Sequence, residues 1–384
     1  MNRISVILLC SALSFSVTAL AGKSSSKVPM DQLKAFAETY WQIKNSYVDE
    51  VDDKKLLEGA INGMLRSLDP YSGFLGEDDL KDLSATSDGI YDGLGVEVSN
   101  QEETVKIVGV VDDSPAERAG LKADDIIVSV DTYEVAVQGA EAVIDAMRGS
   151  AGQAVELGVV KQGQEEITKL TLVRETIELA SVLVDELDDG MWHVKLRVFQ
   201  RDSGYELERV LLRAARGKQI NGLILDMRDN PGGVLRAAVD VSDLLLSSGT
   251  IVSTDGRTED SKQRYYANPG DPLETVPLVV LINERSASAS EIVAGALQDH
   301  GRGKIIGQKS FGKGVVQSIV PIRQNAAIKL TTSRYYTPKG RSINGTGIAP
   351  DVEVETEQLA AGVEHVDRVV QEAKRQLLAI AKVD

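Results

Sequence analysis

Apolar residues recur at helical spacing between Met30 and Leu68, so the pattern predicts amphipathic helices in this stretch. The stretch ends at Asp69-Pro70-Tyr71-Ser72-Gly73, a run of turn-forming residues. We therefore expect a small helical arm, which we place at residues 22–85.

A second pattern begins near Gly93, where short apolar runs alternate with turns as far as Arg174. One predicted helix, Gln138 to Met147, interrupts these runs. The arrangement predicts a single β-rich domain, which we place at residues 86–178. Its strands are expected at residues 94–98, 105–111, 126–130, 154–160 and 170–173.

From Ser181 onward the predicted strands alternate with helices, which is typical of βαβ units and a mainly parallel sheet. Ligands of such sheets lie beyond the carboxyl ends of the strands. We place this αβ core at residues 179–356 and a final amphipathic helix, Glu364 to Ala381, within residues 357–384. The predicted fold class is therefore that of a multidomain α/β protein. The core elements are expected at 222–227 (strand), 234–246 (helix), 278–283 (strand) and 290–298 (helix).

The first residues have the charged, apolar and small-residue order of a secretory signal. Arg3 precedes an apolar run from Ile4 to Leu20, and the run ends in Ala19-Leu20-Ala21. We expect cleavage after Ala21, which removes residues 1–21 and places the mature chain in the periplasm. The alternative is an uncut membrane anchor, for which the apolar run is slightly short.

Charge and cysteine usage exclude several classes of function. The 384 residues include 42 Lys and Arg against 58 Asp and Glu, a net charge of −16, so no nucleic-acid-binding surface is expected. The only cysteine, Cys10, lies within the signal, so the mature chain has neither a disulfide nor a thiol nucleophile. No pair of histidines or carboxylates shows metal-ligand spacing, so no metal or other cofactor is expected.

The β-rich domain opens with Gly93-Leu94-Gly95-Val96, where glycines let backbone N–H groups converge on an anion. Taken alone, these glycines would indicate an ordinary turn. The segments Ser114 to Leu121 and Asp124 to Asp131 follow, and together the three segments resemble a PDZ domain. The resemblance implies that a peptide adds as a strand and that its terminal carboxylate binds at Gly93, Leu94, Gly95 and Val96.

Three serines lie between a predicted strand and helix, in Arg285-Ser286-Ala287-Ser288-Ala289-Ser290-Glu291. Small residues there permit close approach of a substrate, and amides at a helix start suit an oxyanion. We expect Ser290, followed by Glu291, to begin the helix, which leaves the other two serines unexplained.

A lysine-containing loop follows at Gly307 to Gly314 and nearly matches a phosphate-binding P-loop. However, Gly314 stands where a P-loop has Ser or Thr, and residues 315–320 alternate like a strand rather than a helix. Nucleotide binding is therefore not expected. Lys313, between two glycines, can instead project into a cleft.

Further motifs lie at Asp69-Pro70-Tyr71, Asp226 to Gly233, Ser286 to Glu291, Ser310 to Gly314 with Gln317, and Arg334 to Pro338. Together with the PDZ segments, they resemble the C-terminal processing proteases, also called tail-specific proteases. Matched by motif position, the resemblance implies Ser288 as the nucleophile, Lys313 as its general base and Gln317 as the residue that orients the lysine. It implies the backbone N–H groups of Gly233 and Ala289 as the oxyanion hole.

The resemblance also implies partners. They are protein or peptide substrates with accessible C-termini and, for some members of the family, a helical-repeat adaptor or a homo-oligomer. The helical arm and the last helix are candidate surfaces for such assembly. Plain packing on the core is an equal alternative for both.

The chemistry of the implied residues is consistent with these roles. A serine hydroxyl needs a neutral base, whereas a free lysine titrates near 10.4, so the site must lower that pKa by about three pH units, on the order of 4 kcal/mol. Gln317 is four residues after Lys313, so on an extended strand both face the same way, and its amide oxygen can accept from the amine. An exposed strand face is the alternative for Gln317. Asp226 and Arg228 are expected to brace their loop.

We therefore expect an exported serine endopeptidase with a Ser-Lys dyad that cleaves proteins recognised through their C-terminal tails. Two alternatives stay open. A non-catalytic binding protein would not need Ser288, Lys313 and Gln317 together. A Ser-His-Asp protease would have to use His193, His300 or His365, of which the first two lack motif context.

Overall fold

The computed structural model describes residues 29–101, 104–217, 220–271, 273–323, 325–354 and 367–381. The predicted secretory signal lies outside these residues. The chain divides into two compact units, Met1–Ile61 and Asn62–Asp384. None of the helices in the described part of the chain combines the length and the apolar character needed to cross a membrane.

Helices form the described part of the first unit, as their apolar spacing predicts. It contains α1 (Met30–Ser46) and the start of α2 (Asp53–Arg66). α1 has no buried residue, and apolar side chains that include Phe36, Ile43 and Leu56 line a hollow of about 790 Å³ between the two helices. The apolar side chains that line this hollow form the apolar face of α1 and α2, and the other described residues of the unit leave this face largely uncovered.

The second unit begins with the remainder of α2, β1 (Gly73–Leu75) and α3 (Glu77–Asp88), which lead into the β-rich domain. Five strands form its sheet in the order β3-β4-β5-β7-β8, and β6 pairs with β5. β3 is an edge strand, so one of its sides is free of strand partners in the described structure. The elements are β3 (Val96–Gln101), β4 (Thr104–Val110), α4 (Pro115–Arg118), β5 (Ile126–Val130), β6 (Tyr133–Glu134), α5 (Val135–Gln138), α6 (Ala140–Met147), β7 (Ala154–Val160) and β8 (Ile167–Val173).

The start and the end of this domain are joined by a two-stranded antiparallel ladder. β2 (Ile90–Gly93) pairs with β9 (Glu175–Glu178), so the chain enters and leaves the domain at one place. β5 and β7 have the predicted bounds. The strand expected at 94–98 instead begins at Val96, because Gly95 has a left-handed backbone with φ 81° that interrupts the extended chain.

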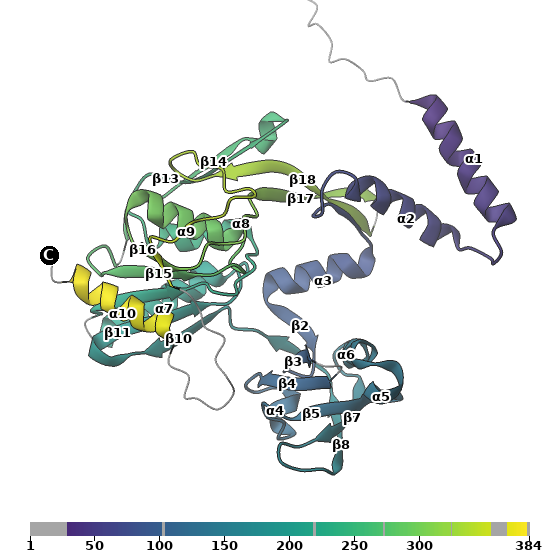
Figure 1. Ribbon diagram of the computed structural model, residues 1–384, viewed down its shortest axis with the longest axis horizontal. Coiled ribbons are helices and arrows are strands. Elements are labelled where there is room, and N and C mark those ends of the chain that lie inside the picture. The colour runs from purple at the N-terminus through teal and green to yellow at the C-terminus, as the bar shows by residue number, and fades with distance from the viewer. Residues whose placement is uncertain are drawn as a thin grey trace, which may run out of the picture. The chain divides into compact units, whose positions relative to one another are not determined.

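A six-stranded sheet in the order β10-β11-β12-β15-β16-β19 forms the αβ core (Figure 1). Its neighbours are parallel except for β10 and β11, which confirms the expected mainly parallel sheet. The strands are β10 (Val182–Glu186), β11 (Met191–Leu196), β12 (Gly222–Asp226), β15 (Leu278–Ile282), β16 (Lys304–Gly307) and β19 (Val352–Glu353), and a 3-10 turn spans Asp188–Gly190.

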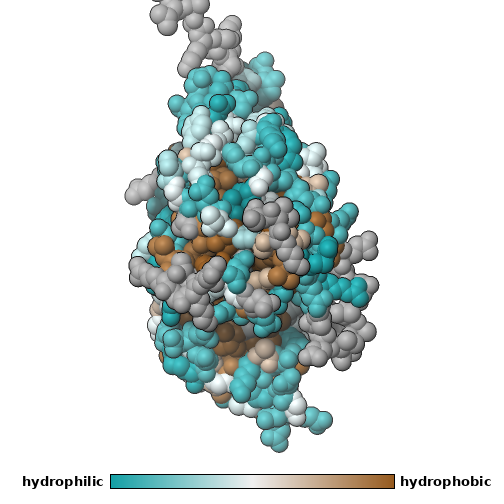
Figure 2. Space-filling view, turned by 90° about the vertical axis from the view of Figure 1, so that its left-hand side faces the viewer, coloured by the Kyte–Doolittle hydropathy of each residue, from teal (hydrophilic) through white to brown (hydrophobic). Residues whose placement is uncertain are grey.

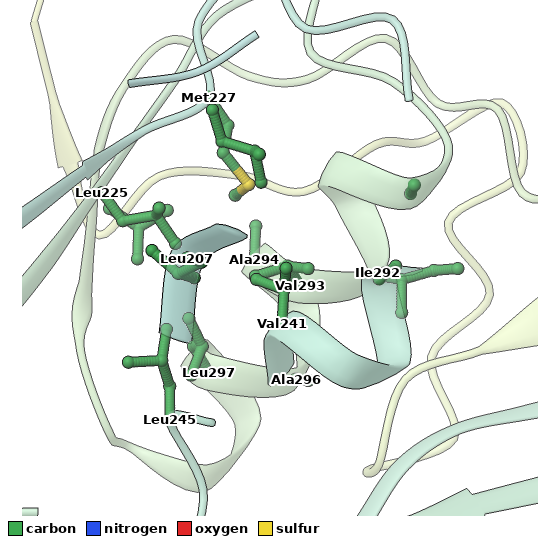
Figure 3. Packing of buried hydrophobic residues seen from close by; sticks show 14 of the residues in the cluster. Leu207, Leu225, Met227, Val241, Leu245, Ile292, Val293, Ala294, Ala296 and Leu297 are labelled. Carbon is green, nitrogen blue, oxygen red and sulfur yellow. The ribbon is translucent and has the colours of Figure 1, made fainter. Parts of the chain in front are cut away.

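Helices cover both faces of this sheet, because alternate strand residues point to opposite sides. Leu223 and Leu225 face the cluster built with α7 (Ser203–Gly217), α8 (Leu235–Asp243) and α9 (Ala289–His300). Figure 3 shows Leu207 of α7, Leu225, Val241 of α8 and Leu297 of α9 converging in this cluster. Ile224 faces α10 (Arg368–Ile380), which packs on the opposite side.

The last helix therefore packs on the core, which is the alternative to an assembly surface. It begins at Arg368, whereas the sequence predicts Glu364, and residues 355–366 lie outside the described part. Figure 2 faces the side on which α10 lies in Figure 1 and shows patches of hydrophobic residues among hydrophilic ones.

A second sheet of the core is antiparallel, in the order β1-β18-β13-β14, with β17 paired to the other side of β18. β17 and β18 form a long hairpin, as the alternation after Gly314 predicts. Its strands beyond β1 are β13 (Thr250–Gly256), β14 (Gln263–Tyr266), β17 (Val315–Arg323) and β18 (Ala326–Tyr336), with a 3-10 turn at Glu259–Ser261.

Candidate active site

Three loops meet at the carboxyl ends of neighbouring parallel strands, where α/β sheets place their ligands. The loop after β12 carries Gly233, the loop after β15 carries Ser288, and the loop after β16 carries Lys313. Hydrogen bonds join the loops: Ala287 N donates to Asn230 O at 3.0 Å, and Phe311 N donates to Ser286 O at 3.0 Å. The order of strands in the sheet therefore brings together residues far apart in the chain.

A cleft of about 600 Å³ opens above these loops. Ser288, Ala289, Gly233, Lys313 and Gln317 all line it. Apolar side chains form much of the remaining wall, among them those of Leu80 and Leu83 of α3, Val234, Leu235, Ile292, Val315 and Ile319. The five residues of the core that the resemblance implies thus share one cleft.

Ser288 occupies the last position before α9, with φ 56° and ψ −109°. This left-handed backbone is rare for a residue with a side chain, and such strain clusters at functional sites. A serine held on a tight strand-to-helix turn presents its hydroxyl at the top of the sheet. The expectation that Ser290 begins the helix is wrong: Ser288 is the N-cap, and the Ser290 hydroxyl donates to Asn230 O at 3.0 Å.

The buried carboxylate of Glu291 connects the loops of Ser288 and Lys313. Its Oε2 accepts from Ser288 N at 2.7 Å and from Lys313 N at 2.9 Å. Its Oε1 accepts from the Ser310 hydroxyl and from Gly312 N, both at 2.6 Å. Burial raises the pKa of Glu291, while these four donors act in the opposite direction. One side chain therefore fixes both backbones with four hydrogen bonds.

Lys313 is half-buried beside the cleft. Burial is the largest cause that lowers its pKa, the positive charge of Lys329 adds to this effect, and the Glu291 carboxylate opposes it. Its Nζ lies 5.1 Å from the centre of the Tyr71 ring, within the range of a cation–π contact. The surroundings thus shift Lys313 toward the neutral form that a general base requires.

Gln317 points into the same cleft from β17. Its Nε2 donates to the Thr331 hydroxyl on β18 at 3.4 Å. Within the described ranges, no hydrogen bond joins Lys313 Nζ to Ser288 Oγ or to the Gln317 amide. The three side chains share a cleft but are not in bonded contact.

The loop after β12 lies against the backbone of Ser288. A Cβ added to Gly232 would lie 2.7 Å from Ala287 O, 2.8 Å from Ser288 Cβ and 3.0 Å from Ala289 N, so only glycine fits. Gly232 N donates to Asn230 Oδ1 at 2.9 Å, and Val234 N donates to Phe199 O at 2.8 Å. Between them, Gly233 N has no hydrogen-bond partner among the described residues, and neither has Ala289 N. Both N–H groups are available to a ligand.

Tyr335 is buried beside Ser288 and Lys313. Its hydroxyl donates to Lys313 O and is also a hydrogen-bond partner of the Ser288 side chain. Burial and the Glu291 carboxylate raise the pKa of Tyr335 well above its ordinary value, so the hydroxyl keeps its proton as a donor.

Asp226 and Arg228 brace the loop after β12, as expected. Asp226 accepts from Arg228 N at 3.0 Å, from the Arg228 guanidinium, and contacts His193 Nε2 at 3.0 Å. These partners keep the pKa of Asp226 well below its usual range in spite of burial. Arg228 also binds Asp367, which caps α10, so the last helix is tied to this loop.

Neither described histidine lines the cleft. His193 lies on β11 against Asp226, and His300 ends α9, where its Nε2 contacts Thr250 O at 2.7 Å. His365 lies outside the described residues. A histidine partner for Ser288 is therefore absent from the described wall of the cleft.

The glycine loop of the β-rich domain lies between β2 and β3. Gly95 packs so tightly that an added Cβ would lie 2.1 Å from Ser114 Cβ. Leu94 is buried in the domain core, and Val96 begins the edge strand β3. The Tyr91 ring packs over Gly93. The segment Gly93 to Val96 thus leads from the end of β2 into β3, an edge strand that can still accept a partner strand.

Several site residues are not predicted from the sequence in these roles. Glu291 is expected only as part of a helix start, Tyr335 only as part of a matched segment, and Lys329 not at all. The available signal is the capping-box spacing of Ser288 and Glu291, which places a carboxylate three residues after an N-cap serine.

Comparisons with known proteins define the class. Residues 192–354 match the model of peptidase family S41, residues 106–161 match the PDZ domain, and residues 12–79 match the N-terminal domain of the activating protease CtpB. A carboxy-terminal-processing protease of Bartonella bacilliformis is 41% identical over 84% of this chain and 75% of its own length. The chain belongs to peptidase family S41 and is a serine-type peptidase.

Further relatives specify the branch of the family. The carboxy-terminal processing protease CtpB of Bacillus subtilis is 33% identical over 88% of this chain and 70% of its own length. A solved structure of the photosystem II D1 C-terminal processing protease matches with a TM-score of 0.52 and 29% identity over 85% of this chain and 94% of its own. The expected kinship with C-terminal processing proteases that carry a PDZ domain is confirmed.

Proposed function

We propose that this chain is an exported endopeptidase that uses a dyad of Ser288 and Lys313, and that its PDZ domain selects substrates by their C-terminal tails. The observation that carries the proposal is the convergence of Ser288, Lys313, Gln317, Gly233 and Ala289 on one cleft. A protein of this fold that only binds peptides would not require a strained serine beside a lysine with a lowered pKa.

In this proposal Ser288 Oγ attacks the carbonyl carbon of the scissile peptide bond and transfers its proton to the neutral amine of Lys313. The N–H groups of Gly233 and Ala289 bind the oxyanion of the tetrahedral intermediate. Lys313 then gives the proton to the leaving amine, which departs and leaves an ester on Ser288. Lys313 then removes a proton from a water molecule, which attacks the carbonyl carbon of this ester. The bond between that carbon and Ser288 Oγ breaks, the carboxylic acid product leaves, and Lys313 returns the proton to Ser288 Oγ.

The Lys313 amine has to move toward Ser288 Oγ before the two can react, because Lys313 Nζ lies over the Tyr71 ring. The lysine stem has four carbons and rotates readily. Catalytic hydrogen bonds are often long in unliganded enzymes and tighten when the substrate binds. In the closed form the oxygen of Gln317 accepts from Lys313 and orients the amine without adding charge.

For the PDZ domain we propose that the substrate tail adds to the free side of β3 and that its carboxylate binds at Gly93, Leu94, Gly95 and Val96. The edge position of β3 supports strand addition. The domain range, residues 86–178, is supported by the pairing of β2 with β9. Protein substrates with accessible C-termini are then the principal partners. A helical-repeat adaptor or a second copy of the chain is proposed for the apolar face of α1 and α2.

The dyad is tested with purified mature protein on an unfolded protein that ends in an apolar tail, with and without envelope extract. Ser288→Ala and Lys313→Ala should each abolish cleavage, whereas Lys309→Ala, at an exposed lysine of the same loop, should retain it. Equal cleavage by all four proteins would exclude the dyad. Cleavage lost on Ser288→Ala but kept on Lys313→Ala would assign the base to another residue.

Export is tested separately, by isolating the protein from the periplasmic fraction and sequencing its N-terminus. We expect Gly22 as the first residue. A chain that still begins at Met1 and sediments with membranes would support the uncut anchor instead.

A further inference from the structure

The charges along the cleft differ from those of the whole chain. The sequence has a net charge of −16, yet the lining residues that the structure describes include three cations, Arg201, Lys313 and Lys329, and no carboxylate. In a chain so rich in Asp and Glu, a cleft wall without either indicates a site that favours anionic groups.

Arg201 already has an ion-pair partner, and Lys313 already has a proposed role. Arg201 forms an ion pair with Asp88 of α3. Lys313 is the proposed base, and its neighbouring charges are Glu291 from α9 and Lys329 from β18. Lys329 is half-buried and forms no ion pair with any residue in the described ranges.

Lys329 occupies a defined place along the hairpin. It lies opposite Ile319, and the next pair on the same face is Gln317 opposite Thr331. Ile319, Gln317 and Lys329 all line the cleft. Residues two apart on a strand are separated by about 7 Å, so Lys329 lies roughly one residue pair beyond the Gln317 position along the hairpin. A substrate in the cleft can therefore contact Lys329 while its scissile bond lies at Ser288.

We propose that Lys329 Nζ binds a carboxylate of the substrate inside the catalytic cleft and so sets a preference for an acidic group near the scissile bond. The inference rests on the proposed function. A half-buried ammonium without a partner loses part of its hydration, and a substrate carboxylate restores it with a charge-assisted hydrogen bond. The carboxylate can belong to an Asp or Glu side chain or to the free end of a short tail.

The test uses the full mature protein and a series of neutral, C-terminally amidated peptides that share one cleavage site. Single Asp substitutions are placed at each of the residues flanking the cleaved bond, and a second series compares a free carboxylate with the amide close to that bond. The first series detects a side-chain carboxylate and the second a terminal one. The enzymes are wild type, Lys329→Arg, Lys329→Gln and Lys329→Glu, with Arg264→Gln as the matched control at an exposed cation of β14 in the same sheet.

We expect one position at which the acidic group raises kcat/KM by about 10-fold or more for wild type and Arg264→Gln. Lys329→Arg should keep most of this preference, Lys329→Gln should remove it, and Lys329→Glu should favour Lys at the same peptide position. Added salt should weaken the preference of wild type.

An equal preference in wild type and Lys329→Gln would overturn the inference, even where both cleave the neutral peptide. An absence of any acidic preference in wild type would overturn it as well. Failure of wild type to cleave all peptides would instead count against the proposed function. In that event, fluorescence anisotropy measures how tightly the same peptides bind to Ser288→Ala with and without Lys329→Gln. This comparison decides whether Lys329 recognises the carboxylate.

Discussion

The carboxylate of Glu291 accepts a hydrogen bond from the backbone N–H of Ser288 at 2.7 Å, three residues earlier in the chain. The same oxygen accepts from Lys313 N at 2.9 Å, so one buried atom holds the backbones of both members of the proposed dyad. Because Ser288 has a strained backbone, it needs a partner that holds it in place. Glu291 supplies this partner without touching the reacting atoms.

Glu291→Gln should lower kcat by about 10- to 100-fold. An amide has one acceptor oxygen, so its NH₂ group would face two N–H or O–H donors and displace either the serine or the lysine loop. The measurement is kcat at saturating substrate, with circular dichroism to show that the variant is folded. Glu284→Gln, at an exposed glutamate of the loop before Ser288, is the control. Unchanged kcat in Glu291→Gln would show that the four hydrogen bonds are dispensable.

Gly232→Ala should reduce kcat by roughly a hundredfold or more. The new Cβ would come within 2.8 Å of Ser288 Cβ, and the loop would have to move its neighbouring Gly233 N–H away from Ser288. Gly63→Ala is the control, because nothing lies within 4 Å of a Cβ at that helical position. A Gly232→Ala enzyme with a wild-type kcat would contradict the proposed oxyanion hole.

Lys329→Met should move the acid limb of the pH–rate profile to higher pH. If Lys313 is the neutral base that we propose, activity is present above its pKa and is lost as the pH falls through it. Burial is the largest cause that lowers that pKa, Lys329 lowers it further by charge repulsion, and Glu291 opposes both, while the Tyr71 ring and Tyr335 complete the surroundings. Without the second ammonium the pKa of Lys313 rises. The measurement is kcat/KM from pH 5 to 10 on a neutral peptide. Lys329→Arg should keep the wild-type profile, and a shift to lower pH in Lys329→Met would refute the argument.

Gly95→Ala should abolish capture of a C-terminal tail and leave cleavage of a short, amidated peptide intact. The added Cβ would lie 2.1 Å from Ser114 Cβ, and φ 81° disfavours alanine, so the glycine loop has to rearrange. Gly120→Ala has a similar φ of 74° but open space around the new Cβ, which isolates the effect of the clash. Tail binding is measured by calorimetry with a peptide and its amide. Undiminished binding by Gly95→Ala would exclude this loop as the carboxylate site.

The fold class was predictable from the sequence, because the hydrophobic periodicity of the segments agrees with the order in which strands and helices follow one another. Both faces of the parallel sheet are covered, so every residue of the strands at 222–226 and 278–282 is buried, and the apolar runs Leu223 to Leu225 and Leu278 to Ile282 result. Helical spacing follows each of them. Element ends were harder to predict. The helix expected from residue 290 begins at Ala289, since the N-cap depends on the backbone of Ser288, which neighbouring loops determine.

Only the site residues that belong to recognisable sequence motifs could be predicted. Ser288, Lys313 and Gln317 belong to recognisable segments, and the structure places all three in one cleft. Lys329 belongs to no motif, and its position beside Lys313 follows from the register of β17 with β18. Tyr335 likewise meets Lys313 O because the same register pairs Arg334 of β18 with Val315 at the start of β17.

By itself, the sequence determined which residue types are available and which local elements they form, because propensity, periodicity and turn chemistry act over a few neighbouring residues. It also excluded a cysteine nucleophile from the chain beyond Cys10. The tertiary structure alone decided that Gly233, Ser288 and Lys313 meet, because the order of β12, β15 and β16 places three carboxyl ends side by side. It also decided that Glu291 is buried beneath them, where low polarity raises its pKa and makes each of its four hydrogen bonds costly to lose.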